Sequence, residues 1–453
     1  MTAAQLISHH DADGKADKLR KRLEYRTLAD TDFWSFQSLK NRTGNHALFQ
    51  YPAMMVPELQ GALLDDVQKI DENIRLIYDP FSGSGTVLLE SIYRGLDFHG
   101  SDINPLAILL CEVKAHPPQV EDALAAIEEV STRAAKIKAE ALSFKFIDKW
   151  FKAEIKLGLT KLRASIIEHP VQSTRKFLWI CLAETIRLTS NSRISTFKLH
   201  TYTQADILKR KTDAIKVFRT VAMQNAEHLK KHWQRMPKKT AGQSIPIATL
   251  SPGSVVNLPP NARLADVLMT SPPYGDNKTT VPYGQHSYLA LCWIDHRDLN
   301  ESFDPAMLES TSKIDTMSLG GSLKDADLCI EDLSRTSTSL QEFVASIQEV
   351  PHLRKKVLSF CRDYKRSLST ASNQVKPGGF CFFTLGERRV GKKVFPLVGI
   401  TKDFLVASNH EIVTTIERTL PASRKRMAAK NSEGTTMAKE WILVTRYKGH
   451  YDG

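Results

Sequence analysis

Eight residues, Asp-Pro-Phe-Ser-Gly-Ser-Gly-Thr at 79–86, constrain the fold of this chain more than any other stretch. The residues just before them predict a short strand, and the apolar residues of 87–93 recur at helical spacing. The motif is therefore a tight turn between a strand and a helix. Gly83 and Gly85 can adopt a positive φ and let a ligand approach the backbone. Thr86 is placed to cap the helix, whose first N–H groups point back at the turn.

A second predicted strand ends at the acid Asp102. This acid lies about 20 residues after the glycine turn, where nucleotide-binding α/β folds place a carboxylate that accepts hydrogen bonds from ribose hydroxyls. The turn departs from the dinucleotide-binding pattern G-x-G-x-x-G, because Leu88 occupies the position of the third glycine. Two glycines alone are equally typical of an ordinary turn, so the wider pattern has to decide.

Charge is unevenly distributed along the chain. The 453 residues carry a net charge of +12, whereas 131–250 alone carry 24 Lys and Arg against 8 Asp and Glu, a net of +16. The remainder is therefore net negative, at −4. Apolar residues within 117–240 recur at helical spacing without a clear strand. We predict a basic helical insertion over 117–250 that is suited to an anionic partner, the alternative being a solvated basic surface.

Strands and helices alternate on either side of this insertion. The predicted strands are 74–78, 96–100, 253–258, 265–270, 380–385, 410–418 and 440–447, and the predicted helices include 58–67, 105–113, 352–373 and 395–408. Strands that alternate with helices form a parallel sheet, and two final strands joined by a loop form an antiparallel edge. We therefore expect an α/β fold with a Rossmann-like sheet of seven strands, of which the last is antiparallel.

The predicted strand 265–270 runs directly into Ser271-Pro272-Pro273-Tyr274. Ligands bind beyond the C-terminal ends of the strands in open α/β sheets, near the point where strand order reverses. We therefore expect these four residues to lie beside the glycine turn. Consecutive prolines are otherwise typical of a turn, so their position in the sheet carries the interpretation.

The turn at 79–86 resembles the cofactor motif of S-adenosylmethionine-dependent DNA amino-methyltransferases, and Ser271 to Tyr274 resembles their catalytic motif. The resemblance covers 33–115 and 250–448, and it implies a methyltransferase sheet. It also implies that the turn cradles the methionine part of S-adenosylmethionine, that the acid after the second strand holds its ribose, and that a Tyr-Pro-Ala segment closes over the methionine end. The cofactor-binding residues that it implies are Tyr51, Pro52, Asp79, Phe81, Gly83, Gly85, Thr86, Asp102 and Ile103.

The first residue of the catalytic motif varies in this family: Asp or Asn is typical of adenine N6, and Ser of cytosine N4. Ser271 therefore favours transfer to N4 of cytosine. An exocyclic amine is a poor nucleophile because its lone pair is delocalised into the ring. Two acceptors on its N–H groups, the Ser271 hydroxyl and the Pro272 carbonyl, favour the tetrahedral nitrogen that methylation requires. Pro273 leaves no competing N–H, and Tyr274 offers a face on which a flipped base can stack.

Alignment and desolvation of the two reactants would supply most of the acceleration, without a metal. The C-terminal run from Arg418 to Glu440 also resembles the cytosine-N4 members. The chain departs from many members at Ser254, where they carry an acid that recognises the adenine ring of the cofactor.

DNA recognition is expected from the insertions, because the chain ends soon after its last predicted strand. Arginine reads guanine and asparagine reads adenine in the major groove. The candidate DNA-binding residues are Arg187, Asn191, Arg193 and Lys198 in the basic insertion, and Arg424, Lys425 and Arg426 in a loop without acids. For each of them, a contact to phosphate or a merely solvated position is the alternative.

The expected domains are a polar N-terminal arm at 1–32, two parts of a methyltransferase domain at 33–116 and 251–453, and the insertion between them. A secondary insertion is expected at 275–350. Double-stranded DNA is the expected partner, with a cognate restriction endonuclease as a candidate second partner in a restriction-modification system. We expect a protein of the prokaryotic cytoplasm or nucleoid. No apolar run approaches 18 residues, and six scattered cysteines without C-x-x-C spacing predict reduced thiols and no structural zinc.

Three alternatives stay open. The first is an N6-adenine DNA methyltransferase, and the second is a structured-RNA methyltransferase, for which Asn would be expected in place of Ser271. The third is a catalytically silent DNA-binding subunit on the same scaffold. The intact turn and the intact motif at 271–274 disfavour the third, because a silent copy has no need of both.

Overall fold

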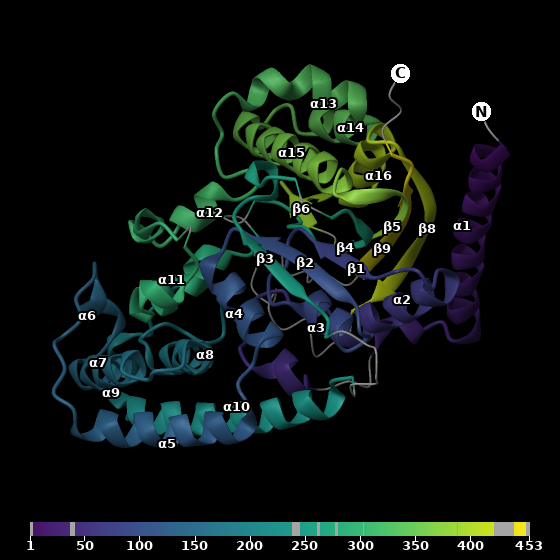
Figure 1. Cartoon of the computed structure of the whole chain (residues 1–453). Helices are drawn as coiled ribbons and strands as arrows, with labels where there is room; N and C mark the ends of the chain where they lie inside the picture. Colours follow the sequence, from purple (N-terminus) through teal and green to yellow (C-terminus); the bar gives the residue numbers. More distant parts are fainter. Residues whose placement is uncertain are drawn as a thin grey trace.

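The computed structural model describes residues 3–36, 41–237, 245–260, 263–276, 280–301, 303–386, 388–420 and 439–449. Within them, seven strands form one sheet in the order β3-β2-β1-β4-β5-β9-β8. Helices cover both faces of this sheet, and a group of further helices extends from one side (Figure 1). The strands of the sheet are β1 Leu76–Asp79, β2 Asp97–Asp102, β3 Ala248–Pro252, β4 Ala265–Thr270, β5 Val375–Gly386, β8 His410–Thr419 and β9 Lys439–Tyr447.

Strand directions follow the pattern of a Rossmann-like methyltransferase sheet. Neighbouring strands are parallel from β3 to β5, whereas β9 runs antiparallel to both β5 and β8. The predicted fold class is therefore confirmed. The chain leaves β1 toward β2 on one side and returns through β4 on the other, so strand order reverses at β1. The C-terminal ends of β1 and β4 are neighbours there, which is where open α/β sheets bind ligands.

The central strands are apolar on both faces because helices cover both. Along β4, Val267 and Met269 join the apolar cluster that includes Phe382, whereas the intervening Leu268 joins the opposite cluster with Phe383. This period of two is that of a strand. One layer contains α1 Ala3–Ala29, α2 Pro57–Ile70, α3 Thr86–Ile92 and α4 Pro105–Ala115, and the other contains α13 Ile330–Thr336, α14 Thr338–Ser346, α15 Pro351–Ser372 and α16 Leu397–Ala407.

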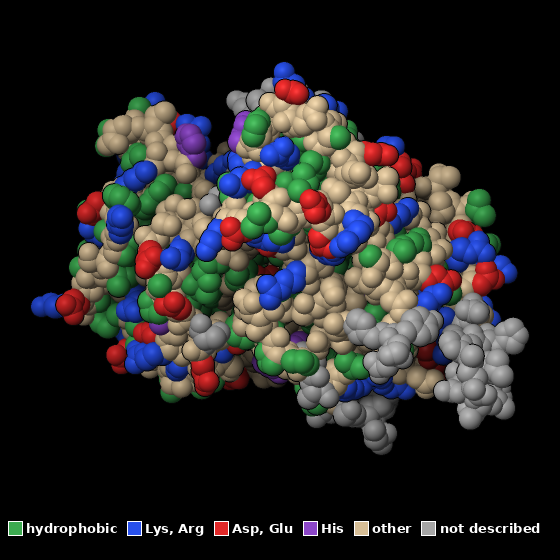
Figure 2. Space-filling view, turned by 90° about the horizontal axis from the view of Figure 1, so that it is seen from above, with side chains coloured by type: hydrophobic (Ala, Val, Ile, Leu, Met, Phe, Trp, Pro, Cys, Tyr) green, Lys and Arg blue, Asp and Glu red, His purple; other side chains and the backbone are tan. Residues whose placement is uncertain are grey.

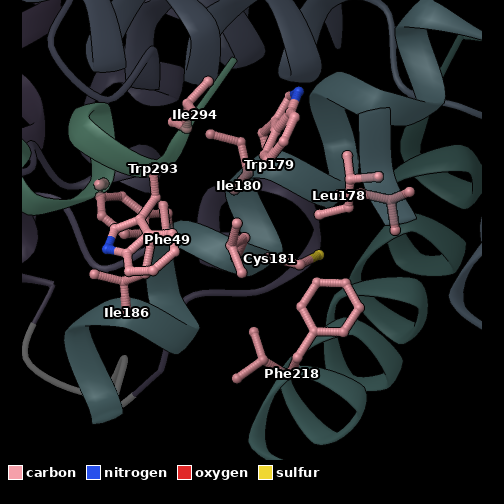
Figure 3. Packing of buried hydrophobic residues seen from close by; sticks show 14 of the residues in the cluster. Phe49, Leu178, Trp179, Ile180, Cys181, Ile186, Phe218, Trp293 and Ile294 are labelled. Carbon is pink, nitrogen blue, oxygen red and sulfur yellow. The ribbon is translucent and has the colours of Figure 1, made fainter. Parts of the chain in front are cut away.

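The segment predicted as helical over 117–240 is confirmed as helical in its described part, which extends to residue 237. Its helices are α5 Val120–Lys136, α6 Ile147–Trp150, α7 Ala153–Ile167, α8 Gln172–Thr189, α9 Gln204–Lys209 and α10 Ala214–Arg235. They share one apolar core with α4, and Trp179, Cys181, Phe218 and Trp293 all belong to it (Figure 3). Trp293 comes from α11 Tyr283–Trp293, so the insertion is docked on the segment that follows the catalytic motif.

Shorter elements complete the described chain. They are the 3-10 helices Phe33–Ser35, Gly44–Ala47, Val255–Asn257, His296–Asp298, Pro305–Leu308 and Ala326–Cys329, the helix α12 Lys313–Met317, and the hairpin of β6 Arg388–Val390 with β7 Lys393–Phe395. Among the described helices, none is long and apolar enough to cross a membrane. All six cysteines are free thiols, and four of them are buried.

Two local predictions were wrong. No strand forms at the predicted position 253–258. The strand β3 lies just before it and ends at Pro252, because Gly253 has φ +131° and turns the chain out of the sheet into a 3-10 helix. Thr86 does not cap α3: the cap position is Gly85, with φ +68°, and no described side chain makes the capping hydrogen bond. The polar N-terminal arm forms one helix over residues 3–29, which packs Leu19 and Leu23 into the core.

Candidate active site

A cavity of about 850 Å³ lies at the C-terminal ends of the parallel strands. Segments that follow β1, β2, β3 and β4 line it, together with residues from before α2, from α11 and from around α12. The lining residues include Tyr51 to Met55, Pro80 to Ser84, Thr86, Asp102 to Asn104, Gly253 to Val255, Ser271, Pro273 and Tyr283. The glycine turn at 79–86 and the motif at 271–274 therefore meet in one cavity.

The glycine turn is held by Asp102, the last residue of β2. The backbone N–H of Gly83, whose φ is +49°, donates to Oδ2 of Asp102 at 2.8 Å. Oδ1 of the same carboxylate accepts from the backbone N–H of Asn104, also at 2.8 Å. Asp102 thus joins the turn to the start of α4 and still faces the cavity. Burial raises the pKa of this carboxyl to about 6.

The two glycines of the turn have different functions. A Cβ placed on Gly83 would meet Tyr51 no closer than 3.7 Å, so this position borders open cavity. A Cβ placed on Gly85 would lie 2.9 Å from Sγ of Cys111, so this glycine allows α4 to pack against the turn. From behind, the buried amine of Lys114 donates to the carbonyl of Ser84, and burial lowers the pKa of this amine to about 7.

Asp79 lies behind the cavity rather than on its wall. It is fully buried, and its Oδ1 accepts from the Thr270 hydroxyl at 2.6 Å and from the Phe81 N–H at 3.0 Å. Burial raises the pKa of this carboxyl to about 7. Asp79 therefore ties the ends of β1 and β4 together. The predicted cofactor residues that line the cavity are Tyr51, Pro52, Phe81, Gly83, Thr86, Asp102 and Ile103.

An aromatic wall closes the cavity beside the turn, where Tyr51 is the side chain nearest to Gly83. The ring of Tyr51 stacks on Tyr283, with centroids 5.8 Å apart and an interplanar angle of 26°. The Tyr51 hydroxyl accepts a hydrogen bond from the Asn104 amide at 3.0 Å, and this amide also donates to the Ser287 hydroxyl at 2.7 Å. Sequence reasoning missed Asn104 and Tyr283. The Asn-Pro pair at the start of α4 was a usable signal for the first of these, because Asn before Pro is typical of a helix cap.

The four residues of the catalytic motif divide between the cavity and the protein interior. Ser271 and Pro273 line the cavity, whereas Tyr274 is partly buried against the apolar cluster below it. The hydroxyl oxygens of Ser271 and Tyr274 are 3.2 Å apart, within hydrogen-bonding distance. The Tyr274 hydroxyl donates to Oε1 of Glu440 at 3.4 Å, and burial raises its pKa well above the ordinary value.

The candidate DNA-binding residues are in different environments. Arg187, Arg193 and Lys198 line a second hollow of about 420 Å³ beside α11, although Arg187 is also paired with Glu184 at 2.6 Å. Asn191 is 7% exposed, and its amide donates to the Lys149 carbonyl at 3.1 Å. This position therefore serves the packing of the insertion and does not present its amide to a partner. The candidates Arg424, Lys425 and Arg426 lie outside the described residues.

The chain is similar in sequence to a known methyltransferase. The chain is 28% identical over 454 residues to the Type II methyltransferase M.MvaI of Kocuria varians. The match covers 95% of this chain and 96% of the relative. This likeness supports a methyltransferase. Since the match spans nearly all of both chains, the relative aligns with the helical insertion as well as with the sheet. No protein-family model matches the chain.

Proposed function

We propose that this protein is an S-adenosylmethionine-dependent DNA methyltransferase that modifies N4 of cytosine in a base flipped out of the duplex. The observation that carries the proposal is that Ser271 shares one cavity with the Gly83 turn and Asp102. A methyl donor held by the turn would then face a base held by the catalytic motif. The relative's Type II designation supports a place in a restriction-modification system.

The residues present fit S-adenosylmethionine. Asp102 offers a carboxylate at the cavity wall, and Gly83 leaves open space beside the backbone where a side chain would project. Tyr51 and Tyr283 offer an apolar wall at the end nearest the turn. When bound, this cofactor supplies a methyl group on a positively charged sulfur, for which the amine of the base is the nucleophile. The chain's own contribution is to align that amine and to exclude water.

Asp102 gives the proposed cofactor site a pH dependence. The ionised carboxylate accepts hydrogen bonds from ribose hydroxyls, whereas the protonated form loses acceptor capacity. Because burial raises the pKa of Asp102 to about 6, the protonated form accumulates below that pH. We therefore expect the affinity for S-adenosylmethionine, measured by titration calorimetry, to fall as the pH is lowered through about 6.

The variant Asp102→Asn separates this carboxyl from Asp79, whose pKa is raised to about 7 and which lies behind the turn. Weak binding that no longer varies with pH is expected in this variant. An unchanged pH dependence in the variant, or equal affinities above and below pH 6 in the unmodified protein, would contradict the role given to Asp102.

Duplex DNA is the proposed substrate, and the second hollow is its proposed contact. Figure 2 shows Lys and Arg interspersed with Asp and Glu over one face of the molecule, so charge alone does not single out a binding surface. Arg193 and Lys198 differ from Arg187 in that neither forms an ion pair with a described acid. Their charges are therefore available to phosphate groups.

Replacing Arg193 and Lys198 together by alanine is expected to weaken binding to duplex DNA. The plot of log affinity against log salt should become shallower by about two units, one for each phosphate that the variant no longer neutralises. Fluorescence anisotropy at several salt concentrations measures both effects. The double variant Lys209→Ala with Lys216→Ala removes the same charge from exposed positions that do not line the hollow. A lower melting temperature with an unchanged salt slope would instead assign Arg193 and Lys198 a structural role.

The test of the proposed activity is methyl transfer itself. The protein is incubated with S-adenosylmethionine labelled in its methyl group and, in separate reactions, with structured RNA and with long amplified duplex DNA, which contains any short recognition site many times. Label in the DNA is the expected result. Label in structured RNA but not in DNA would favour the RNA methyltransferase, and label in neither would favour the silent DNA-binding subunit.

A further inference from the structure

A chain of hydrogen bonds leads from the catalytic serine to an ion pair at the far edge of the sheet. The Ser271 and Tyr274 hydroxyl oxygens are 3.2 Å apart, and the Tyr274 hydroxyl donates to Oε1 of Glu440 at 3.4 Å. Glu440 is paired with Arg418, the residue opposite it on β8. Arg418 is 4% exposed and also donates to the backbone carbonyl of Trp34 at 3.0 Å. This series of hydrogen bonds thus joins four segments that are distant in sequence.

The ion pair leaves one carboxylate oxygen for the tyrosine. Both Nε and Nη2 of Arg418 donate to Oε2 of Glu440, the first at 3.0 Å and the second at 2.5 Å. Oε1 is therefore the oxygen that remains to accept from Tyr274. A carboxylate in an ion pair with arginine has no proton to donate, so the Tyr274 hydroxyl must be the donor in this contact.

The acceptor at Glu440 sets the donor direction of every hydrogen bond in this series. A tyrosine hydroxyl carries one proton, and here that proton is directed at Glu440. Toward Ser271 the Tyr274 oxygen can therefore only accept. The Ser271 proton is then directed at Tyr274, and the serine presents lone pairs alone to the cavity. An acceptor at this position suits an exocyclic amine, which donates, and disfavours a carbonyl oxygen at the same place on a base.

We propose that Glu440 and Arg418 are positioning residues that hold Ser271 as an acceptor toward the target amine, an inference that rests on the proposed methyl transfer. Through this chain they select an amino group, as in cytosine, against the carbonyl of a 4-oxo pyrimidine. They do so without contacting the base.

The variant Glu440→Gln is expected to reverse the donor and acceptor roles along this series of hydrogen bonds. Arg418 has only N–H groups to offer, so the glutamine oxygen takes the place of Oε2 and its NH₂ group faces Tyr274. The tyrosine must then accept from the amide and donate to Ser271, which turns the serine proton toward the cavity. We expect kcat on the amplified duplex DNA to fall by more than about tenfold, since the acceptor aimed at the reacting group is removed. The affinity for S-adenosylmethionine should be unchanged.

The variant Tyr274→Phe distinguishes an effect of Glu440 on the orientation of the Ser271 proton from a purely structural role of Glu440. It removes the hydroxyl that transmits the effect and leaves the ion pair and the aromatic face in place, so kcat should fall by about tenfold while KM for DNA is unchanged. In this background Glu440→Gln should lower kcat by less than about twofold, because the two changes act through one hydrogen bond. This coupling is the expected result even if Glu440→Gln also lowers the melting temperature.

Three outcomes would overturn the inference. An equal fall in kcat from Glu440→Gln in both backgrounds would show that Glu440 only supports the sheet edge. An unchanged kcat in Tyr274→Phe would show that the chain does not reach Ser271, and this variant answers the question even if Glu440→Gln fails to fold. An unmodified protein that transfers no methyl group would instead overturn the proposed function, and the inference with it.

Discussion

Replacing Ser271 by alanine is expected to lower kcat for methyl transfer by about two orders of magnitude, the usual cost of removing one group that stabilises a transition state. The hydroxyl lines the cavity, and Tyr274 holds it at 3.2 Å. Its acceptor is used mainly as the amine becomes tetrahedral, so the loss should appear in kcat and not in cofactor affinity. Single-turnover kinetics with labelled S-adenosylmethionine, together with calorimetry, measures the two quantities separately.

Ser318→Ala is the matched control for this variant. Ser318 lines the same cavity, but its hydroxyl donates to the Asp315 carbonyl at 2.7 Å and is occupied there. Its removal should change kcat by less than about twofold, as for a polar group outside the reacting atoms. If Ser271→Ala kept the activity of the unmodified protein, the serine would have no part in the chemistry.

Replacing Gly83 by valine is expected to abolish cofactor binding. Gly83 has φ +49°, which a β-branched residue adopts only with strain, and its N–H holds Asp102 at the cavity wall. The valine methyl groups would also project into the cavity proposed for the cofactor. A ligand at a hundred times its Kd stabilises the folded state by about 2.7 kcal/mol, so the unmodified protein should melt at a clearly higher temperature with S-adenosylmethionine. The variant should show no such rise.

Gly95→Val controls for the strain alone. Gly95 has φ +71°, and a Cβ there would meet no described atom within 4 Å. This variant should lose stability in the same way as Gly83→Val but keep the rise in melting temperature with S-adenosylmethionine. A full rise in Gly83→Val would remove the glycine turn from the cofactor site.

The sheet and the turn could be predicted because their signals are local. Strand 265–270 and the turn at 79–86 are each encoded in adjacent residues, and the position of Asp102 follows from the length of one helix and one strand. The neighbouring ends of β1 and β4 then followed from the general rule for strand order in such sheets.

The rest depended on contacts that no local pattern encodes. Tyr274 and Glu440 are 166 residues apart, and only the pairing of β4 with β5 and of β5 with β9 brings the acid to the motif at 271–274. Asn191 is a residue type that reads bases, yet in the folded chain its amide donates to the Lys149 carbonyl. Asp79 carried the charge of a ligand-binding acid, yet Thr270, which is distant in sequence, accounts for its position behind the cavity.

Identification of the methylated nucleoside tests the central claim most directly. Duplex DNA treated with the protein and S-adenosylmethionine is digested to nucleosides, which are separated and identified by mass spectrometry against synthetic standards. Ser271 in a cavity shared with the cofactor turn predicts N4-methylcytosine. N6-methyladenine as the methylated nucleoside would contradict the assignment of the target base, and DNA without a methylated nucleoside would contradict the proposed activity.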